Sequence, residues 1–401
     1  MRSTSLSEQF AIPPNAESFV GSANMHPHFT ANHLLPQDIQ GHVRGRHTIT
    51  HTLRSQATLI LFVESQDATI PLCLKLWHAF ENDIYVTSDI DTCNSYTLNG
   101  FAFNRRHAPG VYLGIAPIYH FQDQQSIELG ELLTHPQPDQ LEKGMLYALV
   151  MKRLPQNWRL DHQIYRGNFG TMEDMRFLAT TIAHMHQNLE HAPPHLGQLN
   201  ILQEKWNLNK SFFNEAIAQL QQIFPEHDFA TPQHMILDTM ETYFHNHSAH
   251  FQQRQVFTRR CHGDLKVNNL WLTHTPPHQT QHLLALDCID FKDEFAYIDP
   301  MSDIAMLAMD LEAHLIVSWQ HGQALDDTPE QLVNLFLKYY LDHNECTYSN
   351  HIWRWYGLEK AIICTYVNIC VDRDIQKGMR YVGRAITYAN KLQQQLLGTY
   401  H

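Results

Sequence analysis

The residue types around position 264 are those that phosphoryl transfer to a hydroxyl group requires. Residues 261–270 (Cys-His-Gly-Asp-Leu-Lys-Val-Asn-Asn-Leu) place a carboxylate, Asp264, five residues before an amide, Asn269. A carboxylate can orient an acceptor hydroxyl and take its proton. An amide oxygen on the same loop is a hard ligand of the kind that Mg²⁺ prefers. We therefore expect Asp264 to act as the base and Asn269 to bind the metal.

A second acidic segment, residues 286–291 (Leu-Asp-Cys-Ile-Asp-Phe), offers another metal ligand. On a strand, positions 287 and 290 face opposite sides, so only one of them points at the metal unless the strand ends between them. We prefer Asp290 and keep Asp287 as the alternative. A cation must also hold the phosphates that are not transferred, and Lys75, in the middle of an apolar strand pattern, is the candidate. The alternative for Lys75 is a side chain that simply faces solvent.

The first third of the chain has the pattern of a small sheet with one helix. Strands are expected over 57–63, 70–77, 111–118 and 145–151, and a helix over 92–106. In the second strand Leu72, Leu74 and Leu76 share one face, which leaves Cys73, Lys75 and Trp77 on the other. A polar connection over 121–144 separates the last two strands.

Beyond Pro155 the pattern becomes helical. Thr171 and Asp174 fit a capping box in front of an amphipathic helix. Thr328-Pro329 marks another helix start, and 352–397 is largely helical, whereas 270–272 and 283–291 are short β-like pieces. The sequence thus predicts an α+β fold, with an arm or lid over 1–45, a β-rich lobe over 46–151 and a helical lobe over 152–401.

Five motifs in order resemble a known group of enzymes. They are Asn104-Arg105-Arg106-x-Ala-Pro109-x-Val-Tyr112-Leu113-Gly114, Met151-Lys152-Arg153-Leu154-Pro155, Cys261-His262-Gly263-Asp264-Leu265, Asp287-Cys288-Ile289-Asp290-Phe291 and Ile298-Asp299-x-x-Ser302-Asp303. His262-x-Asp264-x-x-x-x-Asn269 followed by Ile289-Asp290-Phe291 looks like the catalytic loop and metal strand of the aminoglycoside phosphotransferase and choline kinase family. Over about 45–390, the chain is most similar to a bacterial aminoglycoside-phosphotransferase-like group.

The resemblance implies a protein-kinase-like fold of two lobes and an ATP- and Mg²⁺-dependent enzyme that phosphorylates a hydroxyl of a small molecule. It implies that the adenine lies near Met151 to Leu154, that His262 shapes the loop and that Asp303 supports the loop by accepting its backbone N–H groups. Protein kinases have Lys two residues after the catalytic Asp, where small-molecule relatives have His. Lys266 follows the protein kinases and is expected to be a catalytic cation.

The chain departs from this group at several positions. Relatives usually fix the phosphate-binding lysine with a Glu on the following helix, and that position falls near Gly100. Lys75 is then held otherwise, for example by Asp89 or Asp91, or nucleotide binding is weak, or activity is lost. Basic residues that relatives place near the C-terminus are replaced here by Cys364 and Tyr366.

These departures keep two other functions open. One is a non-catalytic, nucleotide-binding regulatory protein. Many relatives carry a second P-loop ATPase domain, and because this sequence has no G-x-x-x-x-G-K-[ST] motif, such an ATPase would be a separate partner. The other is transfer of phosphate, or another part of ATP, onto a protein, which only Lys266 supports.

The composition excludes several classes of protein. The 401 residues carry a formal charge of −13 without a Lys/Arg-rich stripe, which is unlike a nucleic-acid binder. No apolar stretch has the length of a membrane span. The 29 His lack zinc-site spacing, and the seven Cys contain no C-x-x-C. We expect a cytoplasmic enzyme with reduced thiols and no membrane or nucleic-acid partner.

Overall fold

The structure is a computed structural model that describes residues 43–55, 57–65, 71–81, 86–87, 89–122, 125–275, 280–344 and 350–398. The expected arm over 1–45 lies outside these ranges except for its last three residues. The described chain forms two compact units. The strand unit comprises Asn268–Ala296 and the described part of Thr30–Gln163, and the helical unit comprises Ile164–Val267 and the described part of Tyr297–His401.

The strand unit is built on a closed antiparallel barrel. Among the described residues its strand order is β1-β2-β3-β6-β4-β5, and β5 pairs with β1 to close it. The strands are β1 (Gly45–Arg54), β2 (Thr58–Ser65), β3 (Leu72–Trp77), β4 (Tyr112–Gln122), β5 (Ser126–Leu129) and β6 (Tyr147–Lys152). The sequence predicted β2, β3, β4 and β6. The closing strands β1 and β5 were not predicted. Strand β1 is largely polar, and β5 lies within the stretch over 121–144 that was expected to be a polar connection.

The predicted alternation along β3 is confirmed. Leu72, Leu74 and Leu76 are buried in the barrel core, together with Leu61 and Val150 from the neighbouring strands. Because successive side chains of a strand point to opposite faces, Cys73, Lys75 and Trp77 lie on the outer face of the barrel.

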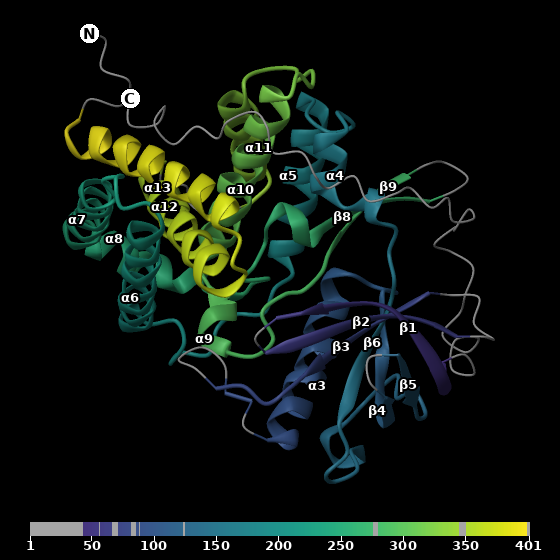
Figure 1. Ribbon diagram of the computed structural model, residues 1–401. Helices are drawn as coiled ribbons and strands as arrows, with labels where there is room; N and C mark the ends of the chain where they lie inside the picture. Colours follow the sequence, from purple (N-terminus) through teal and green to yellow (C-terminus); the bar gives the residue numbers. More distant parts are fainter. Residues whose placement is uncertain are drawn as a thin grey trace. The chain divides into compact units, whose positions relative to one another are not determined.

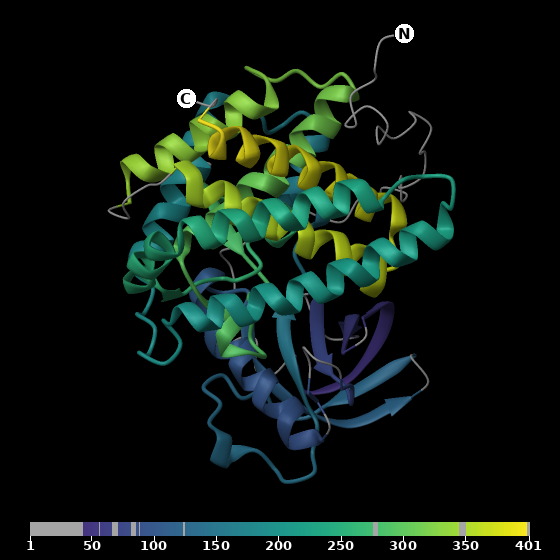
Figure 2. The same cartoon turned by 90° about the vertical axis from the view of Figure 1, so that its left-hand side faces the viewer.

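Helix α3 (Ile90–His107) covers this outer face, as Figures 1 and 2 show, and contacts β3, β4 and β6. It begins where Asp89 caps it by accepting the N–H of Thr92. Phe101 packs with Tyr112, Leu149 and Met151 in a second core between helix and barrel.

A hairpin completes the strand unit. Strand β8 (Leu270–Thr275) pairs with β9 (Thr280–Ala285) so that Leu270 is opposite Ala285. The residues before β8 and after β9 therefore lie at the same end of the hairpin, and the N–H of Leu286 donates to the carbonyl of Asn269. Short helical segments also belong to this unit, namely η1 (Pro138–Gln140), η2 (Gln156–Trp158), η4 (Val267–Asn269, whose first residue belongs to the helical unit) and α9 (Asp293–Ala296).

The helical unit consists mainly of α-helices. The chain enters it within α4 (Leu160–Tyr165). Its elements are α5 (Met172–Gln187), α6 (Leu199–Ile223), α7 (Ala230–Asn246), α8 (Ser248–Arg254), η3 (Gln255–Phe257), α10 (Pro300–Gln320), α11 (Pro329–Asp342), α12 (Asn350–Tyr366), the π-helical η5 (Val367–Val371) and α13 (Ile375–Leu396). Helices α12 and α13 run side by side (Figures 1 and 2), and α12 also packs on α10 and α6.

The helix starts that the sequence predicted are confirmed. Thr171 and Asp174 form a reciprocal capping box at α5, and Thr328 caps α11 in front of Pro329. Helix α10 is buried on nearly all sides. Two short strands, β7 (Arg259–Arg260) and β10 (Tyr297–Ile298), pair just before the segment that carries Asp264.

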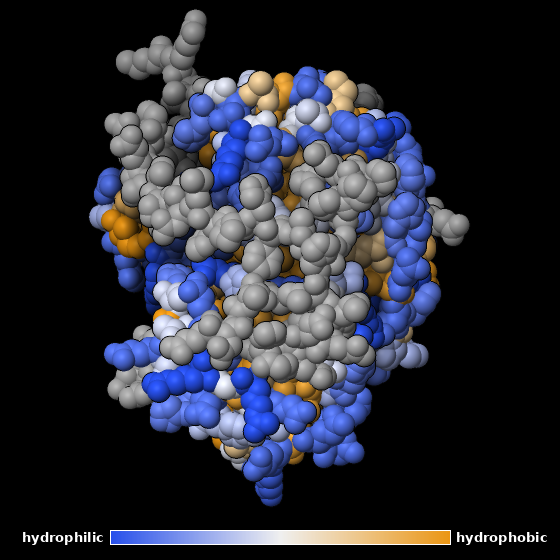
Figure 3. All heavy atoms as spheres, turned by 90° about the vertical axis from the view of Figure 1, so that its right-hand side faces the viewer, coloured by the Kyte–Doolittle hydropathy of each residue, from blue (hydrophilic) through white to orange (hydrophobic). Residues whose placement is uncertain are grey.

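The protein is therefore an α+β protein with a β-rich N-terminal part and a mostly helical C-terminal part, as predicted. Within the described ranges no helix is long and apolar enough to cross a membrane. On the face drawn in Figure 3, hydrophobic residues show in several separate places among hydrophilic ones.

Candidate active site

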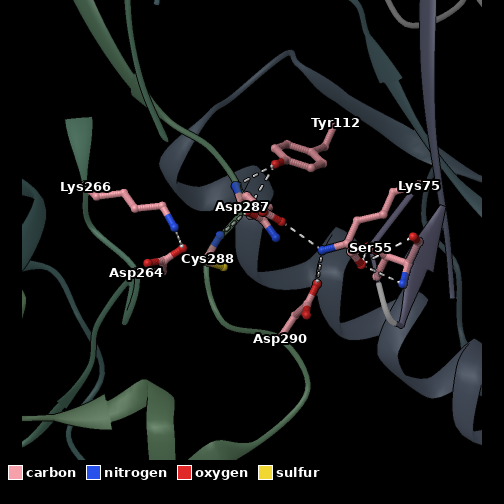
Figure 4. Close-up of polar contacts among 10 residues, drawn as sticks. Ser55, Lys75, Tyr112, Asp264, Lys266, Asp287, Cys288 and Asp290 are labelled. Carbon is pink, nitrogen blue, oxygen red and sulfur yellow. Dashed lines mark hydrogen bonds and ion pairs between the residues drawn. The ribbon is translucent and has the colours of Figure 1, made fainter. Parts of the chain in front are cut away.

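Lys75 forms the centre of an acidic cluster in the strand unit. Its Nζ lies 2.8 Å from Asp287 Oδ1 and 3.5 Å from Asp290 Oδ2, as Figure 4 shows. Burial opposes the charge on Lys75, but the two carboxylates outweigh burial and raise the pKa of this lysine well above its usual value. Lys75 is 9% exposed, so it is a buried cation and not a solvent-facing one. The ion-pair partners of Lys75 both follow β9, whereas the sequence had suggested Asp89 or Asp91 at the start of α3.

The two carboxylates differ in their environment. The side chain of Asp287 is 56% exposed and that of Asp290 is 2% exposed. Burial raises the pKa of Asp290 to about 6, although Lys75 acts in the opposite direction. An exposed carboxylate can give up bound water and bind a metal ion. A buried carboxylate that is already paired with a lysine is less accessible to a metal ion.

The prediction of a β-like segment over 283–291 was wrong about where the strand ends. Strand β9 ends at Ala285, so the alternation of a strand does not apply to positions 287 and 290. Asp287 has a φ of +63°, which is uncommon outside glycine but is tolerated best by Asp and Asn. This turn lets both carboxylates contact the same lysine.

Two residues whose roles the sequence did not reveal hold this turn. Tyr112 Oη accepts the N–H of Asp287 at 3.1 Å, and Asn104 Oδ1 accepts the N–H of Cys288 at 2.8 Å. The Tyr112 hydroxyl in turn donates to Asn104 Oδ1 at 3.1 Å. Both residues are buried. In the sequence, both residues belong to the first of the five motifs that carry the family resemblance. That motif did not indicate what either residue does.

Asn269 is tied to the same turn through the hairpin. Its carbonyl accepts the N–H of Leu286, the residue before Asp287. The structure therefore brings the side chains of Lys75, Asp287 and Asp290 together. The hairpin holds the backbone of Asn269 against Leu286, the residue before Asp287.

Met151 is a core residue of the strand unit. It is 8% exposed and packs with Phe101 and Tyr112. The backbone N–H groups that follow it, those of Lys152 and Arg153, donate to Val111 and Pro71 within the barrel. The Met151 side chain thus stabilises the unit from within, and its expected proximity to an adenine stays a prediction.

Asp264 and Lys266 form an ion pair in the helical unit. Their Oδ2 and Nζ atoms are 2.8 Å apart (Figure 4), and each side chain is a little under one-third exposed. Burial disfavours the charge on Lys266, but Asp264, together with Cys364 and Asp310, raises its pKa overall. Lys266 is therefore a fixed positive charge next to the expected base.

The segment that carries Asp264 is held by two carboxylates of α10. Asp303 accepts the N–H groups of His262 and Gly263, each at 3.0 Å, which confirms its expected supporting role. Asp310 accepts the N–H of Val267 at 2.7 Å. Asp310 was missed by the sequence analysis, although an acidic residue in the middle of so apolar a helix was a usable signal.

A small cluster of possible metal ligands lies beneath this loop. His186, Cys261 and Asp303 are buried with ligand atoms within 4.8 Å of one another. Asp303 already accepts hydrogen bonds from the loop backbone, and His186 Nε2 is 3.3 Å from it. His186 Nδ1 pairs with the hydroxyl of Tyr340. Two members of this cluster, His186 and Asp303, are therefore engaged in hydrogen bonds.

Cys364 borders the Asp264–Lys266 pair. It is buried, and burial together with Asp310 raises the pKa of its thiol to about 12, with Lys266 acting in the opposite direction. The position is therefore neutral at physiological pH.

Comparisons with known proteins give matches in structure alone. No protein-family model and no curated protein matches the chain. An ethanolamine kinase from Plasmodium vivax is 11% identical, with 85% of this chain and 81% of that chain covered and a TM-score of 0.39. A glucosamine kinase in complex with glucosamine, ADP and inorganic phosphate is 14% identical, with 88% and 94% covered and a TM-score of 0.40.

A third match is a thermostable mutant of the aminoglycoside phosphotransferase APH(4)-Ia. It is 12% identical, with 86% of this chain and 95% of that chain covered and a TM-score of 0.41. These solved structures are small-molecule kinases to which the chain is similar at low sequence identity.

Proposed function

We propose that the protein is an ATP-dependent phosphotransferase that phosphorylates a hydroxyl group of a small molecule. The observation that carries this proposal is the buried Lys75 between Asp287 and Asp290. A buried lysine costs free energy unless it is paired. Here one of the two carboxylates, that of Asp287, is half-exposed, so the Lys75 ammonium group is held where an anionic ligand such as the phosphates of a nucleotide can bind it.

The donor set beside Lys75 fits a hard divalent cation. Asp287 presents an exposed carboxylate, and Asn269 is tied to the same turn through the Leu286 hydrogen bond. Mg²⁺ prefers one or two such oxygen ligands and completes its coordination with water and phosphate. When bound, it would neutralise charge on the phosphates. We propose Asp287 and Asn269 as its protein ligands, with Asp287 taking the place that the sequence gave to Asp290.

Asp264 and Lys266 are proposed to act on the acceptor. Asp264 orients the hydroxyl and takes its proton, and Lys266 holds a permanent positive charge 2.8 Å from that carboxylate. Asp303 and Asp310 fix the backbone on either side of this pair. Positioning and charge stabilisation account for most of the catalysis in this type of reaction.

Nucleotide binding with and without metal is the direct test. Isothermal titration of the protein with ATP plus Mg²⁺, and with ATP plus EDTA, should show binding that is tighter with the metal. A panel of hydroxyl-bearing metabolites and aminosugars would follow, with ADP release as the assay. Binding without turnover of any acceptor, and without added mass on the protein itself, would instead support a regulatory nucleotide-binding protein. No binding of any nucleotide would refute the proposal.

A further inference from the structure

Gly100 leaves the space in which the Asp290 carboxylate lies. It is a buried residue in the interior of α3, where glycine costs about 1 kcal/mol relative to alanine. A Cβ at this position would lie 2.7 Å from Asp290 Oδ2 and 3.3 Å from Leu149 Cδ2. Both are too close for an ordinary contact, so any larger residue would displace the carboxylate.

Aromatic contacts hold the residue that follows Asp290. The next residue, Phe291, makes edge-on ring contacts with Trp77 and Tyr96 at centroid distances of 6.1 and 6.5 Å. Trp77 also lies under the ammonium group of Lys75, 5.1 Å from its Nζ. Asp290 thus lies against α3 at Gly100 and is paired with Lys75, and the residue that follows it is held by this aromatic cluster.

A carboxylate this deeply buried needs a cation to offset its desolvation. The only cation it is paired with in the described part of the chain is Lys75, with which it shares a 3.5 Å contact. Asp287, by contrast, reaches the same lysine from a half-exposed position. The two acidic residues therefore have different roles in spite of their common partner.

We propose that Asp290 is a positioning residue that holds Lys75, and that Gly100 is glycine because this carboxylate occupies the volume of its missing side chain. The negative charge that a helix residue would present to the lysine comes instead from the segment after β9. The inference rests on the proposed function of Lys75 as the phosphate-binding cation. It assigns Asp290 a role that does not depend on metal.

A first experiment separates the two carboxylates. ATP affinity is measured by isothermal titration for Asp290→Asn and Asp287→Asn, each in Mg²⁺ and in EDTA. Asp290→Asn should weaken binding about 10-fold in both conditions, a change of about 1.4 kcal/mol. Asp287→Asn should remove the gain that Mg²⁺ gives, so that its affinities in Mg²⁺ and in EDTA become nearly equal. The inference is overturned if Asp290→Asn acts only when Mg²⁺ is present.

A second experiment moves the charge. Gly100→Glu and Asp290→Ala are made singly and together, with the Gly100→Gln/Asp290→Ala pair as a matched control without the charge. Each single variant should bind ATP more weakly, the first by collision and the second by loss of the Lys75 partner. The Glu/Ala double variant should recover most of the wild-type affinity, and the Gln/Ala control should not. A double variant no better than its glutamine control would refute the proposal.

Thermal unfolding of the same proteins without nucleotide provides a readout that does not depend on function. The Glu/Ala variant should unfold at a higher temperature than the Gln/Ala control, because only the former restores a partner to the buried lysine. If the wild type binds no nucleotide, the proposed function fails. The comparison of melting temperatures still tests whether a carboxylate at position 100 can replace Asp290 as the partner of Lys75. If the wild type binds ATP and neither readout separates the two double variants, only the present inference fails.

Discussion

Asp303 and Asp310 lie on the same face of α10, seven residues apart, and each accepts backbone N–H groups of the segment that carries Asp264. Asp303 binds the start of this segment at His262 and Gly263, and Asp310 binds its end at Val267. Residues two helical turns apart point the same way, so one straight helix can hold both ends of a loop. The spacing of two acidic residues on α10 thereby sets the position of the expected base.

Replacement of Asp310 should lower the turnover rate without affecting nucleotide binding. Asp310→Ala leaves the N–H of Val267 without its carboxylate, and a lost hydrogen bond to a charged group costs about 1.5–3 kcal/mol. We expect lower stability and a kcat reduced about 10-fold, with an unchanged ATP affinity. Urea denaturation measures the stability, steady-state kinetics measure kcat, and isothermal titration measures the ATP affinity. Tyr381→Phe, which removes a hydroxyl that donates to the other oxygen of Asp310, is the control and should retain most of the rate. An unaltered kcat in Asp310→Ala would contradict the role.

Removal of the Tyr112 hydroxyl should weaken the response to Mg²⁺. The hydroxyl accepts the N–H of Asp287, whose positive φ costs free energy that such hydrogen bonds offset. Tyr112→Phe should raise the Mg²⁺ concentration needed for half-maximal ATP binding, with binding in EDTA unaffected. Tyr147→Phe is the matched control, because its hydroxyl accepts a backbone N–H of Glu142 in the same core. Equal effects of the two variants would show that the change is only one of packing.

The parts of this structure that could be predicted from the sequence are those that depend on neighbours along the chain. The capping box at Thr171 and the alternation around Leu74 are local, and both were found. The functions of Asn104 and Tyr112 depend on hydrogen bonds to residues more than 170 positions away. No periodicity reports such bonds.

The same reasoning explains two features of the fold that the sequence did not predict. Strand β5 is short and is defined by its pairing with β1 and β4, which closes the barrel. The end of β9 at Ala285 follows from the turn at Asp287, a residue type that does not itself demand a positive φ. Pairing and turn geometry are tertiary properties, so the sequence could not tell which of Asp287 and Asp290 has the exposed carboxylate. The choice of metal ligand between them stays a prediction.

Cys364 should make the protein less stable at alkaline pH. Burial and Asp310 raise the pKa of its thiol to about 12, with Asp264 acting in the same direction and Lys266 and Lys377 in the opposite one. Between about pH 9 and 12 the unfolded chain has lost this proton and the folded chain keeps it. Stability therefore falls as pH rises, by at most about 1.4 kcal/mol per pH unit. The non-titrating Cys364→Ser should show a shallower fall in melting temperature between pH 8 and 10.5. Parallel curves for the two proteins would contradict the shift.

Loss of the Lys75 charge should weaken ATP binding more than it weakens the fold. Lys75→Met keeps the aliphatic length in β3 and removes the ammonium group that both Asp287 and Asp290 contact. We expect ATP affinity to fall about 10- to 100-fold, equivalent to about 1.4–2.7 kcal/mol. Isothermal titration is the measurement, and Lys143→Met, which removes an exposed charge from the same unit, is the control. An affinity equal to that of the wild type would refute the phosphate role of Lys75.

Asp264→Asn should abolish transfer and spare nucleotide binding. The amide keeps the size of the side chain but cannot take a proton, and loss of a general base typically costs about 10²- to 10⁴-fold in rate. The variant also removes the ion-pair partner of Lys266, so Lys266→Met is made in parallel to separate the two effects. Asp264→Asn should lose activity at every pH with an ATP affinity within about threefold of the wild type, about 0.7 kcal/mol. Activity that survives in Asp264→Asn but not in Lys266→Met would place the essential group on the lysine and remove Asp264 as the base.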